Sequence, residues 1–357
     1  MFNKSWTWAI LGLISLLLRW VASLVPETTE IIYSRSVFPY IRQLLDMTVA
    51  RFSFPTFYLF LAGVFLVLIL FIFRLIEKKG WKSKSIYSIR SLGNFLGIMV
   101  VFFHFLWGFN YQRIPIIQQL SLLPMPLSQE QLYQEIQHTQ NTLNAIRSQI
   151  TKDTAAIEET IPYAELERVV RKEIKAGLPL LGLNNIGQPR TKEFLPSGFL
   201  RRMGILGIYF PFTGESYIDP TLHELEKPFT VAHEMTHSFG ITNEGEANFV
   251  SWVICTRSEN PLLQYAANFQ LLRYQLNDLY RIKREYYWQV FDSMAPGLRN
   301  DLVSIIQNSQ EIKPISQAIS RRSNDLFLKS QGVEAGVKSY AQLPMLAYTW
   351  KKQQEKK

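Results

Sequence analysis

The two histidines His233 and His237, with Glu234 beside the first of them, are the residues whose types and spacing most favour chemistry. Positions four apart on an α-helix lie on one face, so both imidazoles can reach one metal ion. Glu234 would then stand beside the ion as a general base for a bound water. Catalytic zinc takes three protein ligands and leaves a fourth position for water. A third ligand is therefore needed, and Glu244 and Glu246 are the candidates.

The residues around this HExxH motif predict the elements that position it. Thr230 is the expected N-cap of the helix that carries the histidines, and Gly240 is expected to end that helix. A second helix should begin at about Glu244 and run to Cys255, which would carry an acidic side chain back toward the histidines. An accidental polar stripe on a helix is the alternative for any HExxH string, but these flanking signals favour a metal site.

Three apolar segments near the N-terminus set the class of protein. They cover residues 6–25, 56–76 and 92–109, and each is long enough to cross a bilayer as a helix. Because Arg19 interrupts the first segment, a cleaved signal peptide is its alternative, although its length favours a membrane span. We therefore expect a membrane domain over residues 1–110, a proline-containing linker over 111–127, and a domain over 128–357.

The distribution of charge predicts the orientation. The first loop balances basic and acidic residues, whereas the second has the single acid Glu77 against Arg74, Lys78, Lys79, Lys82, Lys84 and Arg90. The positive-inside rule makes the second loop cytoplasmic and residues 128–357 extracytoplasmic in the cell membrane. Much of the net charge of +9 lies in this loop and in the C-terminal tail. The lipid bilayer is thus the expected partner, and nucleic acid is not.

The remaining pattern predicts a mainly α-helical external domain with one small β-hairpin. Apolar residues recur at helical spacing over 132–150 and 164–176, after a capping box at Ser128. Residues 204–210 and 216–219 are expected to form the two strands of a hairpin just before the histidines. The aromatic residues between 263 and 291 are expected to form core.

A hydrolase would also need hydrogen-bond donors for the oxyanion and a surface for the substrate. Tyr209, Tyr217 and His223 are the nearest donors along the chain, although each is more often a structural group. The first strand of the expected hairpin offers a backbone edge on which an extended peptide could pair as an added strand.

Three stretches of this sequence resemble the bacterial membrane family called domain-of-unknown-function 3810: Gly207 to Glu215, Pro228 to His237 and Glu244 to Phe249. This resemblance implies a multi-pass membrane protein with an external zinc-metallopeptidase-like domain. Asn243 to Asn248 is also similar to the third-ligand segment of thermolysin-like gluzincins, although those enzymes carry Asp where Asn248 stands. This implies a gluzincin-like domain with Glu244 as the ligand and Asn248 orienting a histidine. Glu246 stays open as the alternative ligand.

These observations favour a membrane-anchored zinc metallopeptidase that hydrolyses a peptide or protein substrate by a zinc-activated water, with Glu234 as general base. The alternative is a non-catalytic zinc-binding membrane scaffold or pseudopeptidase. Structural zinc sites are usually closed by four ligands and rich in cysteine. Because Cys255 is the only cysteine of this chain, the enzyme is the favoured interpretation.

Overall fold

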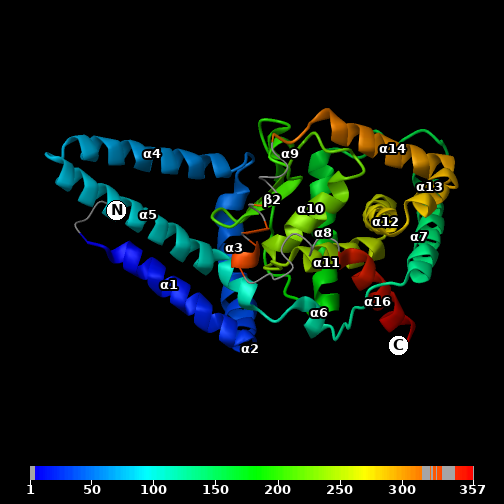
Figure 1. Ribbon diagram of the computed structural model, residues 1–357, viewed down its shortest axis with the longest axis horizontal. Helices are drawn as coiled ribbons and strands as arrows, with labels where there is room; N and C mark the ends of the chain where they lie inside the picture. Colours follow the sequence, from blue (N-terminus) through cyan, green and yellow to red (C-terminus); the bar gives the residue numbers. More distant parts are fainter. Residues whose placement is uncertain (1–4, 316–321, 323–324, 327, 332–341, 357) are drawn as a thin grey trace. The chain divides into compact units, whose positions relative to one another are not determined.

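The computed structural model describes residues 5–315, 322, 325–326, 328–331 and 342–356. The chain is mainly helical with one small sheet, as the sequence predicts, and its elements group into two compact units (Figure 1). The described residues within 1–114 and 210–215 form the first unit, and those within 115–209 and 216–357 form the second. The short segment 210–215 thus belongs with a part of the chain that lies far from it in the sequence.

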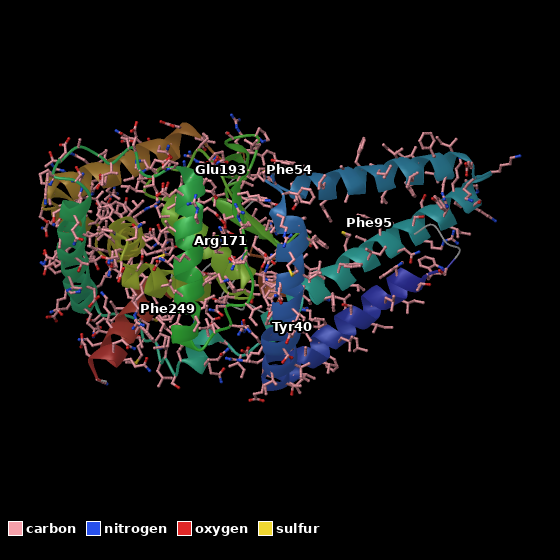
Figure 2. All side chains as sticks on the ribbon, turned by 180° about the vertical axis from the view of Figure 1, so that it is seen from behind. Tyr40, Phe54, Phe95, Arg171, Glu193 and Phe249 are labelled. Atoms are coloured by element: carbon pink, nitrogen blue, oxygen red, sulfur yellow. The ribbon has the colours of Figure 1, made fainter. Side chains whose placement is uncertain are left out.

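Three long apolar helices lie in the first unit. They are α1 (Thr7–Leu24), α4 (Phe57–Ile76) and α5 (Trp81–Leu106), and each is long and apolar enough to cross a membrane. Figure 2 shows that their side chains consist mostly of carbon. The third helix begins well before the expected residue 92. Lys82, Lys84 and Arg90, which we expected in a loop, therefore lie in the N-terminal part of α5.

Small residues allow α1 and α5 to pack closely. A Cβ atom added at Gly97 would lie 2.0 Å from the carbonyl oxygen of Trp8, and one added at Gly12 would lie 2.7 Å from the Cα of Gly97. Gly93 and Gly97 have the GxxxG spacing that brings helix backbones together in membranes. The Asn94 side chain also accepts a hydrogen bond from the backbone N–H of Ala9 at 3.1 Å. The first apolar helix is therefore a packed part of its unit.

The chain between α1 and α4 is helical, where we expected a simple loop. It forms α2 (Pro26–Thr29), the π-helix η1 (Glu30–Val37), α3 (Phe38–Thr48) and the 3₁₀ turn η2 (Val49–Arg51). Arg42 of α3 pairs with Asp46 and donates a hydrogen bond to the carbonyl of Gly214. This bond joins α3 to the segment 210–215. A 3₁₀ turn, η3 (Gly108–Gln112), follows α5 in the same unit.

The second unit is built from helices around one apolar core. The expected capping box at Ser128 and Gln131 is present, and the aromatic segment after residue 263 packs into the core through Tyr265 and Phe269. The helices are α6 (Ile116–Gln119), α7 (Gln129–Ile150), α8 (Tyr163–Gly177), η4 (Leu178–Leu181), α9 (Phe199–Arg202), α10 (Lys227–Ser238), α11 (Glu244–Arg257), α12 (Pro261–Ile282), α13 (Arg284–Asp292), α14 (Pro296–Glu311) and α16 (Leu343–Glu355).

The sheet has the order β1-β3-β2. β1 (Thr191–Glu193) runs parallel to the central β3 (Glu215–Ile218), and β2 (Gly207–Phe210) is the opposite edge strand. The expected hairpin is confirmed as β2 and β3, whereas β1 was not predicted. The Ser216 hydroxyl donates to the carbonyl of Glu234 at 2.8 Å and lies 3.0 Å from the Ser238 hydroxyl. These bonds fix the sheet against α10.

Candidate metal centre

Helix α10 carries His233, Glu234 and His237 through the core, packed against α8, α11 and α12. It begins at Lys227, so Thr230 is not the N-cap that we expected. Thr230 lies inside the helix, and its hydroxyl donates to the carbonyl of Glu226 at 2.9 Å. Pro228 fits the first turn because an N–H there would lack a helical partner. The helix ends at Ser238, and Gly240 supplies a left-handed φ of 81°, as we predicted.

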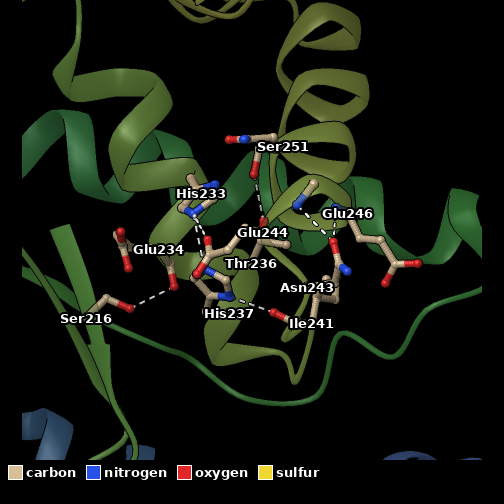
Figure 3. A network of polar contacts seen from close by, with 12 residues as sticks. Ser216, His233, Glu234, Thr236, His237, Ile241, Asn243, Glu244, Glu246 and Ser251 are labelled. Atoms are coloured by element: carbon tan, nitrogen blue, oxygen red, sulfur yellow. Dashed lines mark hydrogen bonds and ion pairs between the residues drawn. The ribbon is translucent and has the colours of Figure 1, made fainter. Parts of the chain in front are cut away.

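Helix α11 begins at Glu244, as the sequence predicts. The Asn243 side chain caps it by accepting hydrogen bonds from the backbone N–H groups of Gly245 at 2.9 Å and Glu246 at 3.1 Å. The Thr236 hydroxyl of α10 lies 2.9 Å from the Ser251 hydroxyl of α11. This polar bridge and the cap hold the first turn of α11 beside the histidines (Figure 3).

Three ligand atoms meet at this point (Figure 3). The Glu244 Oε2 lies 3.1 Å from the His233 Nε2 and 3.2 Å from the His237 Nε2, and the two nitrogens are 3.1 Å apart. In the described part of the chain these residues form a group that can hold a metal ion. Ligands at the usual zinc distances in a tetrahedron lie about 3.3 Å apart. The triangle therefore fits three corners of a zinc site.

A backbone carbonyl sets the orientation of His237. Its Nδ1 lies 2.6 Å from the carbonyl oxygen of Ile241, to which it donates. A proton is thereby placed on Nδ1, and Nε2 is the ring nitrogen that faces the other ligand atoms, as in metal-binding histidines. Asn248, which we expected to orient a histidine, donates to the hydroxyl of Tyr274 at 3.3 Å. Its predicted role stays a prediction.

Burial and mutual charge shape the electrostatics of the site. Burial raises the pKa of Glu234 to about 7, against the opposing effect of the two histidines. Burial alone would lower the pKa of His237, but the facing Glu244 carboxylate raises it to about 9. Burial would likewise raise the pKa of Glu244, but the imidazoles hold it well below its usual range. The negative Glu244 carboxylate thus faces the two histidines, whereas burial favours the protonated form of Glu234.

Glu246 points elsewhere. Its Oε1 accepts a hydrogen bond from the backbone N–H of Ile117 at 3.1 Å, and the residue is buried. The sequence left Glu244 and Glu246 open as the third ligand. The geometry favours Glu244, while the hydrogen bond to Glu246 joins α6 to α11.

Of the three expected oxyanion donors, His223 and Tyr217 make contacts outside the cluster, and the role of Tyr209 stays a prediction. His223 uses both ring nitrogens: Nε2 lies 2.9 Å from the Ser304 hydroxyl, and Nδ1 accepts from the backbone N–H of Leu225 at 3.2 Å. Tyr217 is fully buried in the central strand, with its ring edge-on to Phe194. Tyr209 lies on β2 and is also buried. The contacts of His223 and Tyr217 therefore suit a structural role.

Two residues that the sequence did not single out lie near the reactive groups. A Cβ atom added at Gly207 would lie 2.7 Å from both the Cγ and the Oε1 of Glu234, so the bare backbone of β2 covers the base. The Tyr274 hydroxyl contacts Asn248, and its pKa is raised by burial and by the charge of Glu244. Gly207 had the signal of a glycine inside a strand pattern. Tyr274 had no such signal, because it is one of many aromatic residues in a segment that was expected to form core.

Comparison with curated proteins and with solved structures gave no match. Comparison with protein families gave a match over residues 33–348, which include both helices of the candidate metal centre and most of the first unit. The matched family is described as "Protein of unknown function (DUF3810)", so the resemblance to this family is confirmed, and the chain belongs to it.

Proposed function

We propose that this protein is a membrane-anchored, zinc-dependent peptidase. The observation that carries the proposal is the convergence of the His233, His237 and Glu244 ligand atoms within 3.2 Å of one another, with Glu234 adjacent. A zinc ion held there would lower the pKa of a water and polarise the carbonyl of a substrate. The donor set, two imidazoles and one carboxylate, is that of catalytic rather than structural zinc sites.

Glu234 supplies the proton-transfer group. It neighbours the cluster but is not one of the three converging ligands. Its buried position beside the ligand group suits a base that takes a proton from a metal-bound water and later delivers it to the leaving amine. The covering strand β2 limits the room around its carboxylate, which holds the base in place.

The edge strand β2 supports a polypeptide substrate. An extended peptide can pair with the backbone of an edge strand, and this mode of recognition reads the main chain rather than particular side chains. The backbone of β2 also passes directly over Glu234. A peptide held on this strand would therefore be held close to the base.

The test of the proposal is metal analysis of the purified protein, together with digestion of a broad peptide mixture by the wild type and its Glu234→Gln variant. If the protein is a scaffold that only binds zinc, the wild type and the variant should not differ in peptide hydrolysis. If it is an enzyme with Glu234 as its base, the variant should hydrolyse peptides far more slowly.

Gly207→Ala should lower peptide hydrolysis by about tenfold or more while zinc stays bound, because the added methyl group must displace the Glu234 carboxylate or the strand. Rates of peptide cleavage beside zinc content measure this. Gly63→Ala is the matched control, since a Cβ atom there meets nothing within 4 Å. Full activity of Gly207→Ala would show that the strand does not constrain the base.

The basic residues from Arg74 to Arg90, at the junction of α4 and α5, predict that this junction is cytoplasmic. A reporter fused after Lys357 should be active only outside the cytoplasm, and one inserted after Lys79 only inside it. The bond from Arg42 to Gly214 fits the number of spans, because two spans separate these residues along the chain and place both on the same side. Which side this is follows from the distribution of charge alone. The reverse reporter pattern would place the metal centre in the cytoplasm and refute the assignment.

A further inference from the structure

The strand β2 belongs to both units of the protein. At its start, Gly207 lies in the second unit, directly against the Glu234 carboxylate. At its end, Phe210 belongs to the first unit, together with the turn that leads to Glu215. One short strand therefore connects the proposed base to the unit that contains the apolar helices.

The end of β2 is fixed to the N-terminal end of α4. The Phe210 ring lies edge-on to Phe57 and Phe60, with ring centres 4.9 Å and 5.0 Å apart, and Phe212 stacks on Phe60 at 5.0 Å. Both Phe57 and Phe60 lie in the first turn of α4, a candidate membrane span. Aromatic pairs at these separations are favourable packing contacts.

A polar contact fixes the turn between β2 and β3 at its other end. The Glu215 carboxylate is fully buried and accepts hydrogen bonds from the backbone N–H of Thr56 at 2.9 Å and from its hydroxyl at 2.7 Å. Thr56 is the N-cap residue of α4, so Glu215 satisfies a helix N–H that has no partner within the helix. A carboxylate at a helix N-terminus is also favoured by the helix dipole. The turn is thus attached where the span begins.

The chain itself then limits the distance between the base and the membrane. Gly207 and Phe210 are three strand residues apart, which is about 10 Å. The ends of a membrane-spanning helix lie close to the surface of the bilayer core. The side chains of Leu206 and Ile208 are 45% and 39% exposed, an apolar surface that suits this environment. A peptide paired with β2 over Glu234 must therefore lie within a few residues of the bilayer.

We propose that the substrate is a membrane-anchored polypeptide, cleaved in the extended segment just outside its own span. This inference rests on the proposed peptidase function and names its substrate class. The reaction is amide hydrolysis: water adds to the carbonyl carbon, the C–N bond breaks, and the water proton taken up by Glu234 goes to the leaving amine. A soluble polypeptide would have to reach the same strand without the anchoring that concentrates a substrate at the membrane.

The test uses the full-length protein in proteoliposomes with a single-span reporter that carries a long external segment of mixed sequence. The matched probe is the same segment as a soluble peptide. We expect cleavage of the anchored probe within about ten residues of its span and at least about tenfold faster than cleavage of the soluble probe. Cleavage sites are mapped by mass spectrometry, and Glu234→Gln gives the background.

The outcomes separate the substrate class from the peptidase activity. Equal rates on both probes, with cuts spread along the segment, would overturn the substrate class and leave the peptidase standing. Cleavage of neither probe would overturn the peptidase and this inference with it.

A pair of α4 variants tests the role of the turn. Phe60→Ala removes a ring that contacts both Phe210 and Phe212, whereas Phe65→Ala removes an exposed ring of the same helix. We expect Phe60→Ala to keep its rate on the soluble probe but to spread the cuts on the anchored one, and Phe65→Ala to match the wild type. An unchanged cut pattern in Phe60→Ala would show that the turn does not set the position of cleavage.

Discussion

Replacing Glu234 with glutamine should lower peptide hydrolysis by about a hundredfold or more while zinc stays bound. Glutamine has nearly the shape of glutamate but cannot take up the proton of the attacking water. Zinc should stay because the three converging ligand atoms come from His233, His237 and Glu244. The rate of cleavage of a peptide mixture, with the zinc content of the same preparation, measures both parts.

Glu246→Gln is the matched control for this substitution. Glu246 is also a buried glutamate near the cluster, but its Oε1 accepts from the Ile117 backbone, and a glutamine oxygen can do the same. We expect Glu246→Gln to keep activity within a few-fold of the wild type. If Glu234→Gln cleaved peptides as fast as the wild type, Glu234 would not be the base and the scaffold would become the better explanation.

The second large effect concerns the metal itself. The wild type should bind about one zinc ion per chain, and His233→Ala, His237→Ala and Glu244→Ala should each abolish stoichiometric binding. Each change removes one of three atoms that meet within 3.2 Å of one another, and two remaining ligands hold zinc poorly. Metal analysis after dialysis against a weak chelator measures the occupancy.

Glu246→Ala is the comparison that decides the third ligand. It should keep its zinc, because the Glu246 carboxylate binds the Ile117 backbone. Loss of zinc in Glu246→Ala together with full occupancy in Glu244→Ala would move the ligand assignment to Glu246. Full occupancy in His233→Ala would show that zinc binds elsewhere in the protein.

The proposed metal centre and the candidate membrane spans lie in different units. The second unit holds the candidate ligand residues and the proposed base on α10 and α11, inside a helical core. The first unit holds the candidate spans and the turn at the end of β2. Because β2 begins over the proposed base and ends at α4, the proposed substrate edge and the contact with a candidate span are parts of one strand. This continuity is the physical basis for expecting a substrate that is itself anchored.

Local patterns in the sequence determined most of the helical elements and the pairing of the two histidines. The spacing of His233 and His237 places them on one helix face, the box at Ser128 begins α7, and Gly240 ends α10. The three apolar segments can be identified as candidate membrane spans from their length and composition alone. These features depend on interactions between residues a few positions apart, and such interactions can be read directly from the order of residues.

Tertiary packing decided which of two nearby glutamates faces the histidines. Glu244 and Glu246 are two positions apart on α11, which rotates their side chains by about 200° around the helix. Their spacing shows only that they point to different sides. The face that meets α10 depends on how the two helices pack, through contacts such as the one between Thr236 and Ser251. The sequence could therefore offer both candidates but not choose between them.

The tertiary structure also brought together residues that no local pattern connects. Gly207 covers Glu234, the carbonyl of Ile241 orients His237, and the turn before Glu215 joins the unit of the apolar helices. A glycine, a main-chain carbonyl and a turn carry almost no side-chain signal of their partners. Their roles arise from close approach between segments far apart in the chain, which only the packing of the whole fold determines.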